Sequence, residues 1–246
     1  MTLERCVTNP AVTIIGDECE LDPKRFVVAC GGRAEFWQTR SSPTRTGPVA
    51  SLQRGYEIST APILAFIHDD VEIYEAGWDA AVLEEFQRPG VGVVGFGGAL
   101  GLGTDDIYKT PYRLQQLARL QYGSNAPDWQ THGHRFTGSR EVATLDGYCL
   151  IVRRELLDKI GGWKVMQTQF HCYDTALTLY ARRHGYKVRQ LGIYAKHCGG
   201  GTSVKDGRYA EWLKREFGKT DADVHRESHD WLYAEFKDVL PVRVNQ

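Results

Sequence analysis

The sequence Ile63-Leu64-Ala65-Phe66-Ile67-His68-Asp69-Asp70 decides the fold class of this chain. Five apolar residues in a row after Pro62 are typical of a strand that is buried on both faces, as in a parallel sheet covered by helices. The run ends at three polar residues, and residues that directly follow a buried parallel strand lie at its carboxyl end. Because open α/β sheets bind ligands at that edge, the stretch predicts both a sheet and the position of a site.

Shorter runs on either side of this strand predict that strands and helices alternate. Strands are expected at Val12–Ile15, Phe26–Cys30, Ala34–Thr39, Val91–Phe96, Leu145–Arg153, Tyr186–Leu191 and Ile193–Lys196. Helices are expected at Gly47–Ser59, Asp79–Phe86, Arg154–Ile160, Asp174–His184, Tyr209–Phe217 and Ser228–Val239. This alternation is typical of an α/β protein with a mostly parallel central sheet that is flanked by helices.

The length and composition fit one globular domain. The 246 residues fall within the range of single α/β domains, and 42% hydrophobic with 25% charged residues argues against disorder. Thirty basic and 31 acidic residues give a net charge of −1, which disfavours a non-specific polyanion binder. Since the chain shows no internal repeat and no clear linker, the sequence predicts a single domain over residues 1–246.

The sequence carries no signal for a membrane or for the extracellular space. Its longest mostly apolar stretch, Val91–Gly103, has 13 residues including six glycines, whereas a bilayer span needs about 20 apolar residues. The first ten residues carry charges where a signal peptide would be apolar. The six cysteines are scattered without a CxxC pair, so reduced thiols in a cytoplasmic protein are expected.

The adjacent carboxylates of Asp69 and Asp70 are costly at the end of a buried strand unless a cation meets them. A divalent metal that carries a diphosphate would do so, since hard oxygen ligands suit magnesium or manganese. The alternative is that both residues merely end the strand and cap the following turn. These residues alone favour that alternative, and the motifs that follow them reverse the balance.

The downstream motifs come in a fixed series, namely Asp146-Gly147, Gly161-Gly162-Trp163, Phe170–Asp174, His184-Gly185-Tyr186 and His197. In this order the chain resembles the family-2 glycosyltransferases of GT-A fold, which is a Rossmann-like α/β fold. The passages FIHDDVEIYEAGWD, ATLDGYCLIVRRELL and FHCYDTALTLYARRHGYKV look most like the glycosyltransferase-like branch first described in streptomycin biosynthesis. The resemblance covers about residues 45–200.

The resemblance implies roles for individual residues. Asp70 matches the metal ligand at the last position of the Asp-x-Asp site, and His197 matches the late histidine that completes the metal site. Asp69 matches the middle position, which contacts the ribose in some relatives. Asp174 matches the general base of a Glu-Asp pair, whereas Tyr173 replaces the Glu and leaves the local hydrogen bonding open.

Three further residues of the motif series are candidates for contact with the donor. His68 stands where many relatives have an Asp, and it either hydrogen-bonds the nucleotide or simply packs. Asp146 either hydrogen-bonds a sugar hydroxyl, with Gly147 letting the backbone come close, or the two residues form a turn before a strand.

The nucleobase contacts are predicted from position alone. Gly31, Gly32 and Arg33 follow the second predicted strand and are expected beside the base, unless they form a plain tight turn. Arg45 and Gln53 precede the strand that carries the metal site, where relatives place polar residues that contact the nucleotide. The alternatives are a solvated loop residue at 45 and a helix-face residue at 53.

Together these assignments imply a metal-dependent, inverting sugar transfer. An acceptor hydroxyl attacks the anomeric carbon of a nucleoside-diphosphate sugar, with UDP favoured, and Asp174 takes its proton. The metal at Asp70 and His197 neutralises the leaving diphosphate, and an imidazole ligand shifts the expected ion from Mg²⁺ towards Mn²⁺. The nucleotide-sugar half is placed at about 1–100, the acceptor and catalytic half at about 101–205, and C-terminal helices at about 206–246.

Two other functions compete with this one. A metal-dependent phosphohydrolase would use His68 and Asp69 as a His-Asp pair, but it needs an earlier histidine, and His68 is the first of eight. A non-catalytic nucleotide-sugar or carbohydrate binding module stays open. The acceptor also stays open, with a glycan or small molecule favoured and a modified DNA base as a further option, for which a local basic face is offered by Arg113, Arg119, Arg135 and Arg140.

Overall fold

The computed structural model describes residues 11–16, 35–40, 47–68, 71–104, 119–122, 130–131, 136–168, 170–197 and 208–244. Several predicted features lie outside these described residues. They are the Phe26–Cys30 strand and the candidate site residues Gly31, Arg33, Arg45, Asp69 and Asp70.

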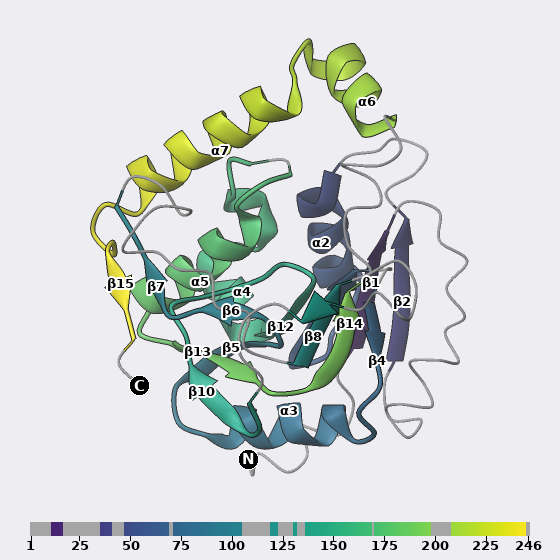
Figure 1. Ribbon diagram of the computed structural model, residues 1–246, viewed down its shortest axis with the longest axis vertical. Helices are drawn as coiled ribbons and strands as arrows, with labels where there is room; N and C mark the ends of the chain where they lie inside the picture. The colour runs from purple at the N-terminus through teal and green to yellow at the C-terminus, as the bar shows by residue number, and fades with distance from the viewer. Residues whose placement is uncertain are drawn as a thin grey trace.

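A seven-stranded mixed sheet forms the centre of the protein (Figure 1), with the strand order β10-β13-β5-β12-β3-β1-β2. The strands are β1 (Ala11–Gly16), β2 (Glu35–Arg40), β3 (Ile63–His68), β5 (Val91–Gly95), β10 (Ser139–Glu141), β12 (Cys149–Arg153) and β13 (Lys187–Leu191). β3 occupies a central position and is buried along Ile63–Ile67, as its unbroken apolar sequence predicts.

The expected α/β class, with a central sheet flanked by helices, is confirmed, but the strand pairing is mixed rather than mostly parallel. Three of the six pairings in this sheet are parallel, namely β1–β2, β1–β3 and β5–β13. β12 runs antiparallel between β3 and β5, and β10 runs antiparallel to β13. β12 follows the short strand β11 (Thr144–Leu145), which belongs to a separate two-stranded pairing, after a turn at 146–148.

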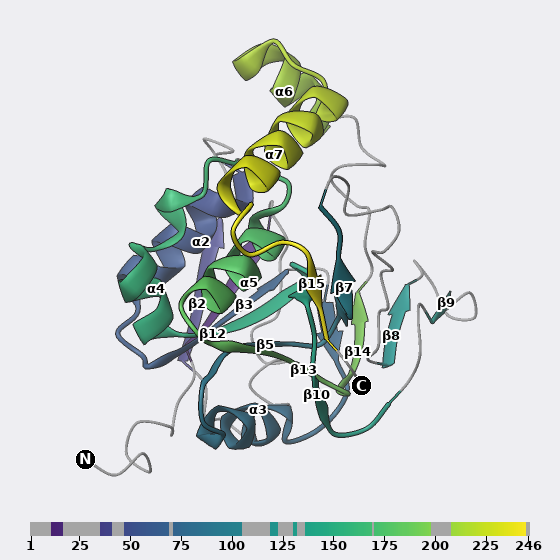
Figure 2. The same cartoon turned by 90° about the vertical axis from the view of Figure 1, so that its left-hand side faces the viewer.

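Helices cover both faces of the sheet, as the two perpendicular views show (Figures 1 and 2). The helices are α2 (Gly47–Ile58), α3 (Trp78–Gln87), α4 (Arg154–Ile160), the 3-10 turn η2 (Trp163–Val165), α5 (Tyr173–Arg183), α6 (Arg208–Phe217) and α7 (Asp221–Glu235). α3 packs on one face, and α2, α4 and α5 pack on the other. α7 contributes its apolar side to the core that contains α5.

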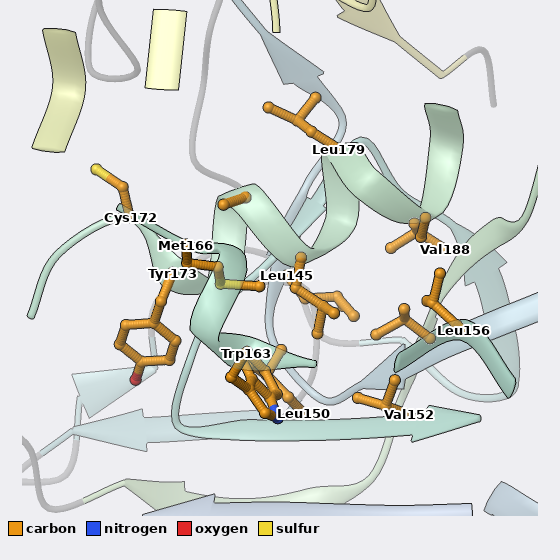
Figure 3. Close-up of a cluster of buried hydrophobic side chains, with 14 of the residues drawn as sticks. Leu145, Leu150, Val152, Leu156, Trp163, Met166, Cys172, Tyr173, Leu179 and Val188 are labelled. Atoms are coloured by element: carbon orange, nitrogen blue, oxygen red, sulfur yellow. The ribbon is translucent and has the colours of Figure 1, made fainter. Parts of the chain in front are cut away.

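The largest hydrophobic core packs α5 against the sheet (Figure 3). Phe66 of β3 meets the edge of the Trp163 ring, with centroids 5.2 Å apart, and both side chains are fully buried. Burial of a large apolar side chain of this kind stabilises a fold by about 1.5–3 kcal/mol. Tyr173 lies at the margin of the cluster with its hydroxyl pointing away from it. The core therefore holds the start of α5 in place and leaves a polar group at its border.

Short strands form a second, four-stranded sheet in the order β4-β14-β8-β9. Its strands are β4 (Val71–Ile73), β14 (Tyr194–His197), β8 (Arg119–Tyr122) and β9 (Gln130–Thr131). Two further two-stranded pairings join β6 (Gly98–Ala99) with β11, and β7 (Gly101–Leu102) with β15 (Val242–Arg243). The region 101–140, which lacks periodicity in sequence, thus contains short strands among its described residues.

Two predicted elements have different bounds in the structure. The strand expected at Leu145–Arg153 is broken into β11 and β12 by a turn at 146–148. The helix expected at Ser228–Val239 begins earlier, at Asp221, because Thr220 and Asp223 form a capping box. The Thr220 N–H donates to Asp223 Oδ2 at 3.0 Å, and the Asp223 N–H donates to Thr220 Oγ1 at 3.2 Å.

Two observations concern the environment of the protein. Within the described part of the chain, every helix is too short or too polar to cross a bilayer. Cys149 and Cys172, the cysteines that fall in this part, are buried and form no disulfide. A cytoplasmic location stays a prediction.

Candidate active site

Histidines from two distant parts of the sequence meet at the carboxyl end of β3. His68 is the last residue of β3 and His197 the last of β14, and their ring centroids are 5.5 Å apart. The fully buried Tyr148 stacks on His197, with centroids 5.0 Å apart and an interplanar angle of 19°. The structure thus brings together two of the residues that the family resemblance singles out.

The pairing of β4 with β14 fixes the backbone position of one predicted metal ligand, His197. His197 is directly opposite Val71, which follows Asp70 in the sequence. Among the described residues, no group of three or more His, Cys, Asp or Glu side chains is placed to hold a metal ion. Asp70, the other predicted metal ligand, lies outside the described residues, so the metal site at His197 stays a prediction.

Tyr173 joins three parts of the site. Its hydroxyl oxygen lies 2.8 Å from His68 Nε2, although the ring is only 6% exposed. The same oxygen would lie 2.5 Å from a Cβ at position 147, so Gly147 is required for this close approach. The Tyr that replaces the family's Glu thus holds His68 and packs on the 146–148 turn. The close neighbour of Gly147 is this phenol, and the predicted contact of Gly147 with a donor sugar stays a prediction.

Asp174, the second residue of α5, has both carboxylate oxygens hydrogen-bonded to the backbone. The Gly147 N–H donates to Oδ2 at 2.9 Å, and the Thr175 N–H donates to Oδ1 at 2.7 Å. An ionised carboxylate offers about four acceptor sites, so each oxygen can accept a further hydrogen bond. A role as helix cap accounts for the Thr175 bond, but it does not account for the bond from the distant Gly147.

The environment of Asp174 changes its acidity. Burial raises the pKa of its carboxyl to about 7, and the negative charge of Asp146 adds to the rise. The backbone N–H groups that bond to the carboxylate favour the anion, but loss of solvation outweighs them. A base with a pKa near the working pH transfers protons well in both directions.

The backbone just before Asp174 is strained. Cys172 has φ 62°, and among the described residues it is the non-glycine with a positive φ. Such a conformation costs about 1–3 kcal/mol and is found at functional sites, where the surrounding structure holds it. Burial raises the pKa of the Cys172 thiol far above its usual range, and the charge of Asp174 adds to the effect. Cys172 is therefore not a nucleophile at neutral pH.

Two other candidates have structural partners. Asp146 Oδ1 accepts a hydrogen bond from the Tyr148 N–H at 3.2 Å, which is the turn predicted as the alternative to a sugar contact. Gln53 Oε1 accepts from the N–H groups of Trp163 at 2.8 Å and Lys164 at 3.1 Å. Gln53 therefore fastens the Gly-Gly-Trp turn to α2, as expected of a helix-face residue.

Of the four arginines that were predicted to form a basic face, the structure describes the side chain of Arg140. The Arg140 guanidinium lies 4.3 Å from the centre of the Phe136 ring, and burial lowers its pKa. Arg140 thus packs on an aromatic ring, a cation–π arrangement. The side chains of Arg113, Arg119 and Arg135 lie outside the described residues.

Two features of the site have no clear signal in the sequence. Tyr148 reads as part of a buried strand, and its stacking on His197 depends on a residue 49 positions later. Cys172 reads as a small buried residue, and its left-handed backbone would be expected of Gly or Asn. For Tyr148 the nearest signal is its position as an aromatic residue directly after Asp-Gly. For Cys172 it is the irregular segment that precedes the helix.

Comparison with known sequences places the chain in a family. Residues 15–199 match the family described as "Glycosyltransferase like family". The uncharacterized protein y4gI of Sinorhizobium fredii (strain NBRC 101917 / NGR234) is 27% identical over 141 residues. The match covers 52% of this chain and 14% of that relative, so this chain corresponds to a small part of the relative's length.

The fold is similar to that of a solved glycosyltransferase structure. GalNAc-T7 with UDP, GalNAc and Mn²⁺ gives a TM-score of 0.50 at 11% identity, over 96% of this chain and 57% of that one. The mannosyltransferase PcManGT from Pyrobaculum calidifontis, in complex with GDP-Man and Mn²⁺, gives 0.49 at 14% identity, over 92% and 69%. Because the family match covers well over half of the sequence, the protein belongs to the glycosyltransferase-like family, and its fold is the GT-A fold.

Proposed function

We propose that the protein transfers a sugar from a nucleoside-diphosphate sugar to an acceptor hydroxyl with inversion, and that Asp174 is the general base. The observation that carries this proposal is the Asp174 carboxylate, which has a pKa of about 7 and is bonded to Gly147 at the start of α5. A hydroxyl is a weak nucleophile, so a base that accepts its proton as it attacks accelerates the reaction by about 10²–10⁴-fold.

The hydrogen bonds of Asp174 support the role of a base. The N–H groups of Gly147 and Thr175 fix the plane of the carboxylate, so that the remaining lone pairs have a defined direction. The acceptor hydroxyl donates to one of these lone pairs while its oxygen bonds to the anomeric carbon. The proton stays on Asp174 until the product leaves, which a pKa of about 7 allows at neutral pH.

We also propose that Mn²⁺, or Mg²⁺, is held by Asp70 and His197. The support is the register that places His197 opposite Val71, the residue after Asp70. When bound there, the metal would supply positive charge that stabilises a leaving diphosphate. UDP is the favoured nucleoside diphosphate, and GalNAc-T7 was crystallised with UDP and Mn²⁺. The donor contacts that stay proposed are those of Gly31, Arg33, Arg45, His68, Asp69, Asp146 and Gly147.

The proposal extends to the division of the chain, the branch of the family and the acceptor. Residues 1–100 are proposed as the donor half, 101–205 as the acceptor and catalytic half, and 206–246 as C-terminal helices of one domain. The motif passages support a place in the branch first described in streptomycin biosynthesis. A glycan or small molecule is the favoured acceptor, and a modified DNA base is the further option.

The experiment that tests the function is a thermal-shift screen of nucleotide sugars with and without Mn²⁺, followed by an assay of donor hydrolysis. A bound donor raises the melting temperature by mass action and identifies the base and the sugar together. Metal-dependent hydrolysis of that donor supports the enzyme. Binding without any turnover would instead support a nucleotide-sugar binding module.

Metal dependence gives a separate prediction. UDP is expected to bind in the presence of Mn²⁺ and to show no measurable binding in EDTA, because the diphosphate would otherwise meet the carboxylates of Asp69 and Asp70 without a cation. Isothermal titration calorimetry measures this, with a titration of UDP into Mn²⁺ alone as the control. Equal affinity in Mn²⁺ and in EDTA would remove the metal from the account.

The pH dependence tests the environment of the base. The value of kcat/KM is expected to rise with pH through about 7, because Asp174 must lose its proton to act as a base. In Asp146→Asn a negative charge that raises the pKa of Asp174 is removed, so this rise should move to lower pH.

A matched control removes the same charge elsewhere. Glu216→Gln changes a carboxylate on α6 that pairs with Arg215, and the pH profile should stay in place. A profile that does not move in Asp146→Asn, or that moves equally in Glu216→Gln, would show that the limb does not report Asp174.

A further inference from the structure

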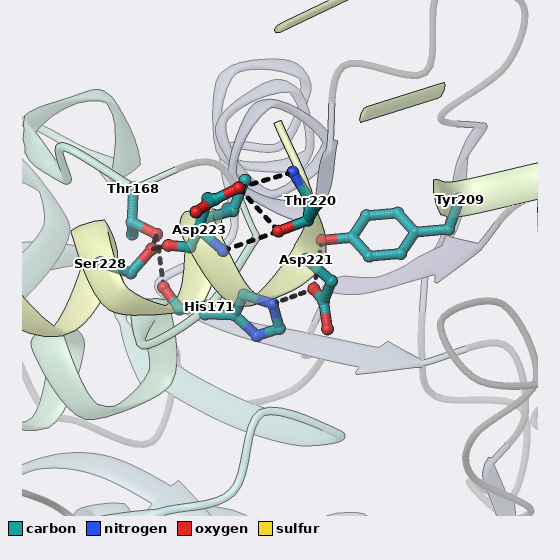
Figure 4. A network of polar contacts seen from close by, with 8 residues as sticks. Thr168, His171, Tyr209, Thr220, Asp221, Asp223 and Ser228 are labelled. Carbon is teal, nitrogen blue, oxygen red and sulfur yellow. Dashed lines mark hydrogen bonds and ion pairs between the residues drawn. The ribbon is translucent and has the colours of Figure 1, made fainter. Parts of the chain in front are cut away.

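The residues just before Asp174 are fastened to α7 (Figure 4). His171 Nε2 lies 2.6 Å from Asp221 Oδ1, in the first turn of α7. Thr168 Oγ1 lies 2.8 Å from Ser228 Oγ, two turns further along the same helix, and is also in hydrogen-bond contact with the His171 carbonyl. The two contacts meet α7 on one face, so the helix acts as a rigid support for His171.

A residue of α6 also contacts Asp221 and the segment before Asp174. The Tyr209 hydroxyl donates to Asp221 Oδ1 at 3.0 Å, and the Tyr209 ring lies against Phe170 with centroids 4.3 Å apart. Tyr209, Thr168 and Ser228 are buried, whereas the side chain of Asp221 is 48% exposed and that of His171 is 20% exposed. A hydrogen bond that an ionised carboxylate accepts is about twice as strong as one between neutral groups.

The position of these contacts in the chain gives them a consequence for the site. His171 directly precedes Cys172, whose backbone is left-handed, and Cys172 directly precedes α5 with Tyr173 and Asp174. A strained residue keeps its conformation only where its neighbours are fixed on both sides. On the far side, Asp174 is held by its bond from Gly147. On the near side, the contact with Asp221 holds His171.

We propose that α6 and α7 position the base: Asp221 holds His171, and His171 thereby fixes the backbone that presents the Asp174 carboxylate. His171 and Asp221 are positioning residues. The proposal rests on the proposed role of Asp174. α6 and α7 lie beyond residues 15–199 that match the family, so this support comes from outside the matched region.

The other end of α5 offers a matched control. Arg183, in its last turn, donates to Glu235 Oε1 at 2.7 Å and to Asp238 Oδ1 at 2.5 Å. These bonds fasten the C-terminal end of α7 to α5 without touching the residues before Asp174. Arg183→Gln therefore loosens the same helix at the end that is remote from the base.

The test compares Asp221→Ala, Asp221→Asn and Arg183→Gln in the full chain. Asp221→Ala should lower kcat by about 10–100-fold, since a misplacement of about 1 Å can cost 10²-fold. UDP affinity in Mn²⁺ should not change. The acid limb of the pH profile should move to lower pH, as water reaches the Asp174 carboxylate. Asp221→Asn keeps an acceptor for His171 and Tyr209, and it should restore most of the activity.

Hydrogen exchange gives a readout that does not depend on turnover. Backbone amides of residues 170–176 should exchange faster in Asp221→Ala and remain protected in Asp221→Asn and Arg183→Gln. An equal loss of kcat in Arg183→Gln, or unchanged exchange in Asp221→Ala, would overturn the positioning role. A wild-type protein without any transfer or hydrolysis would contradict the proposed function, while the exchange result would still decide whether the helices hold this segment.

Discussion

Asp174→Asn is expected to lower sugar transfer by roughly 10²–10⁴-fold per folded molecule, because an amide cannot accept the proton of the acceptor hydroxyl. Affinity for UDP in Mn²⁺ should not change, since the diphosphate is assigned to the metal at Asp70 and His197. Steady-state turnover and calorimetry on the same preparation measure the two quantities.

The stability of this variant must be measured with its activity. Asp174 accepts hydrogen bonds from two backbone N–H groups, and an Asn side chain can accept only one of them. The N–H left facing the amide nitrogen costs about 1–3 kcal/mol. Thr178→Ala is a suitable control, because Thr178 is a buried hydrogen-bonding residue of the same helix, away from the carboxylate. It should lower the melting temperature and leave turnover per folded molecule intact.

The pH dependence of stability also separates the wild type from Asp174→Asn. The folded-state pKa of about 7 lies above the ordinary value of 3.8 for an aspartate, so the folded protein prefers the protonated carboxyl. That preference stabilises the wild type fully below about pH 4, declines as pH rises, and is lost above about pH 7. Between these two pH values the wild type should lose about 4 kcal/mol of folding stability through this group. Asp174→Asn carries no titrating group at this position, so its stability should not show this loss. A destabilised but fully active Asp174→Asn would end the assignment of the base.

Asp70→Asn is expected to have the opposite profile. Loss of a residue that supports a metal ligand typically costs 10–100-fold in metal affinity, so loss of a ligand should cost more than about 100-fold. UDP binding in Mn²⁺ and transfer should therefore be lost together. His197→Gln should act in the same direction, because His197 faces the backbone next to Asp70.

Glu216→Gln, which removes an exposed carboxylate on α6, should leave UDP binding unchanged. Titration calorimetry with UDP at saturating Mn²⁺ compares the three variants. Full UDP affinity in Asp70→Asn would show that the diphosphate is held elsewhere.

The elements that the sequence predicts well are those with strong local patterns. The apolar run of β3 and the helices α4 and α5 appear where they are expected. The orientation of β12 could not be predicted, because its apolar residues fit either direction between β3 and β5. The early start of α7 could have been predicted from Thr220 and Asp223, because their spacing is that of a capping box.

The candidate site also contains features that the sequence predicts and features that depend on contacts between distant residues. The family resemblance predicts Asp174 and His197, and the structure places His197 beside His68. The pKa of Asp174 could not be read from the sequence, because it depends on burial by residues far along the chain and on Asp146. The bond between Tyr173 and His68 spans 105 positions, so a departure from the family pattern gave no indication of its partner.

The most direct test of the account is the configuration of the sugar that the Mn²⁺-loaded protein releases from its donor into water, observed by NMR before the sugar mutarotates. An α-linked donor should yield the β-sugar, because a base at Asp174 directs attack from the face opposite the diphosphate. Asp174→Asn should give the same anomer at least about 10²-fold more slowly. Release of the α-sugar, or an undiminished rate in Asp174→Asn, would contradict inverting transfer with Asp174 as the base.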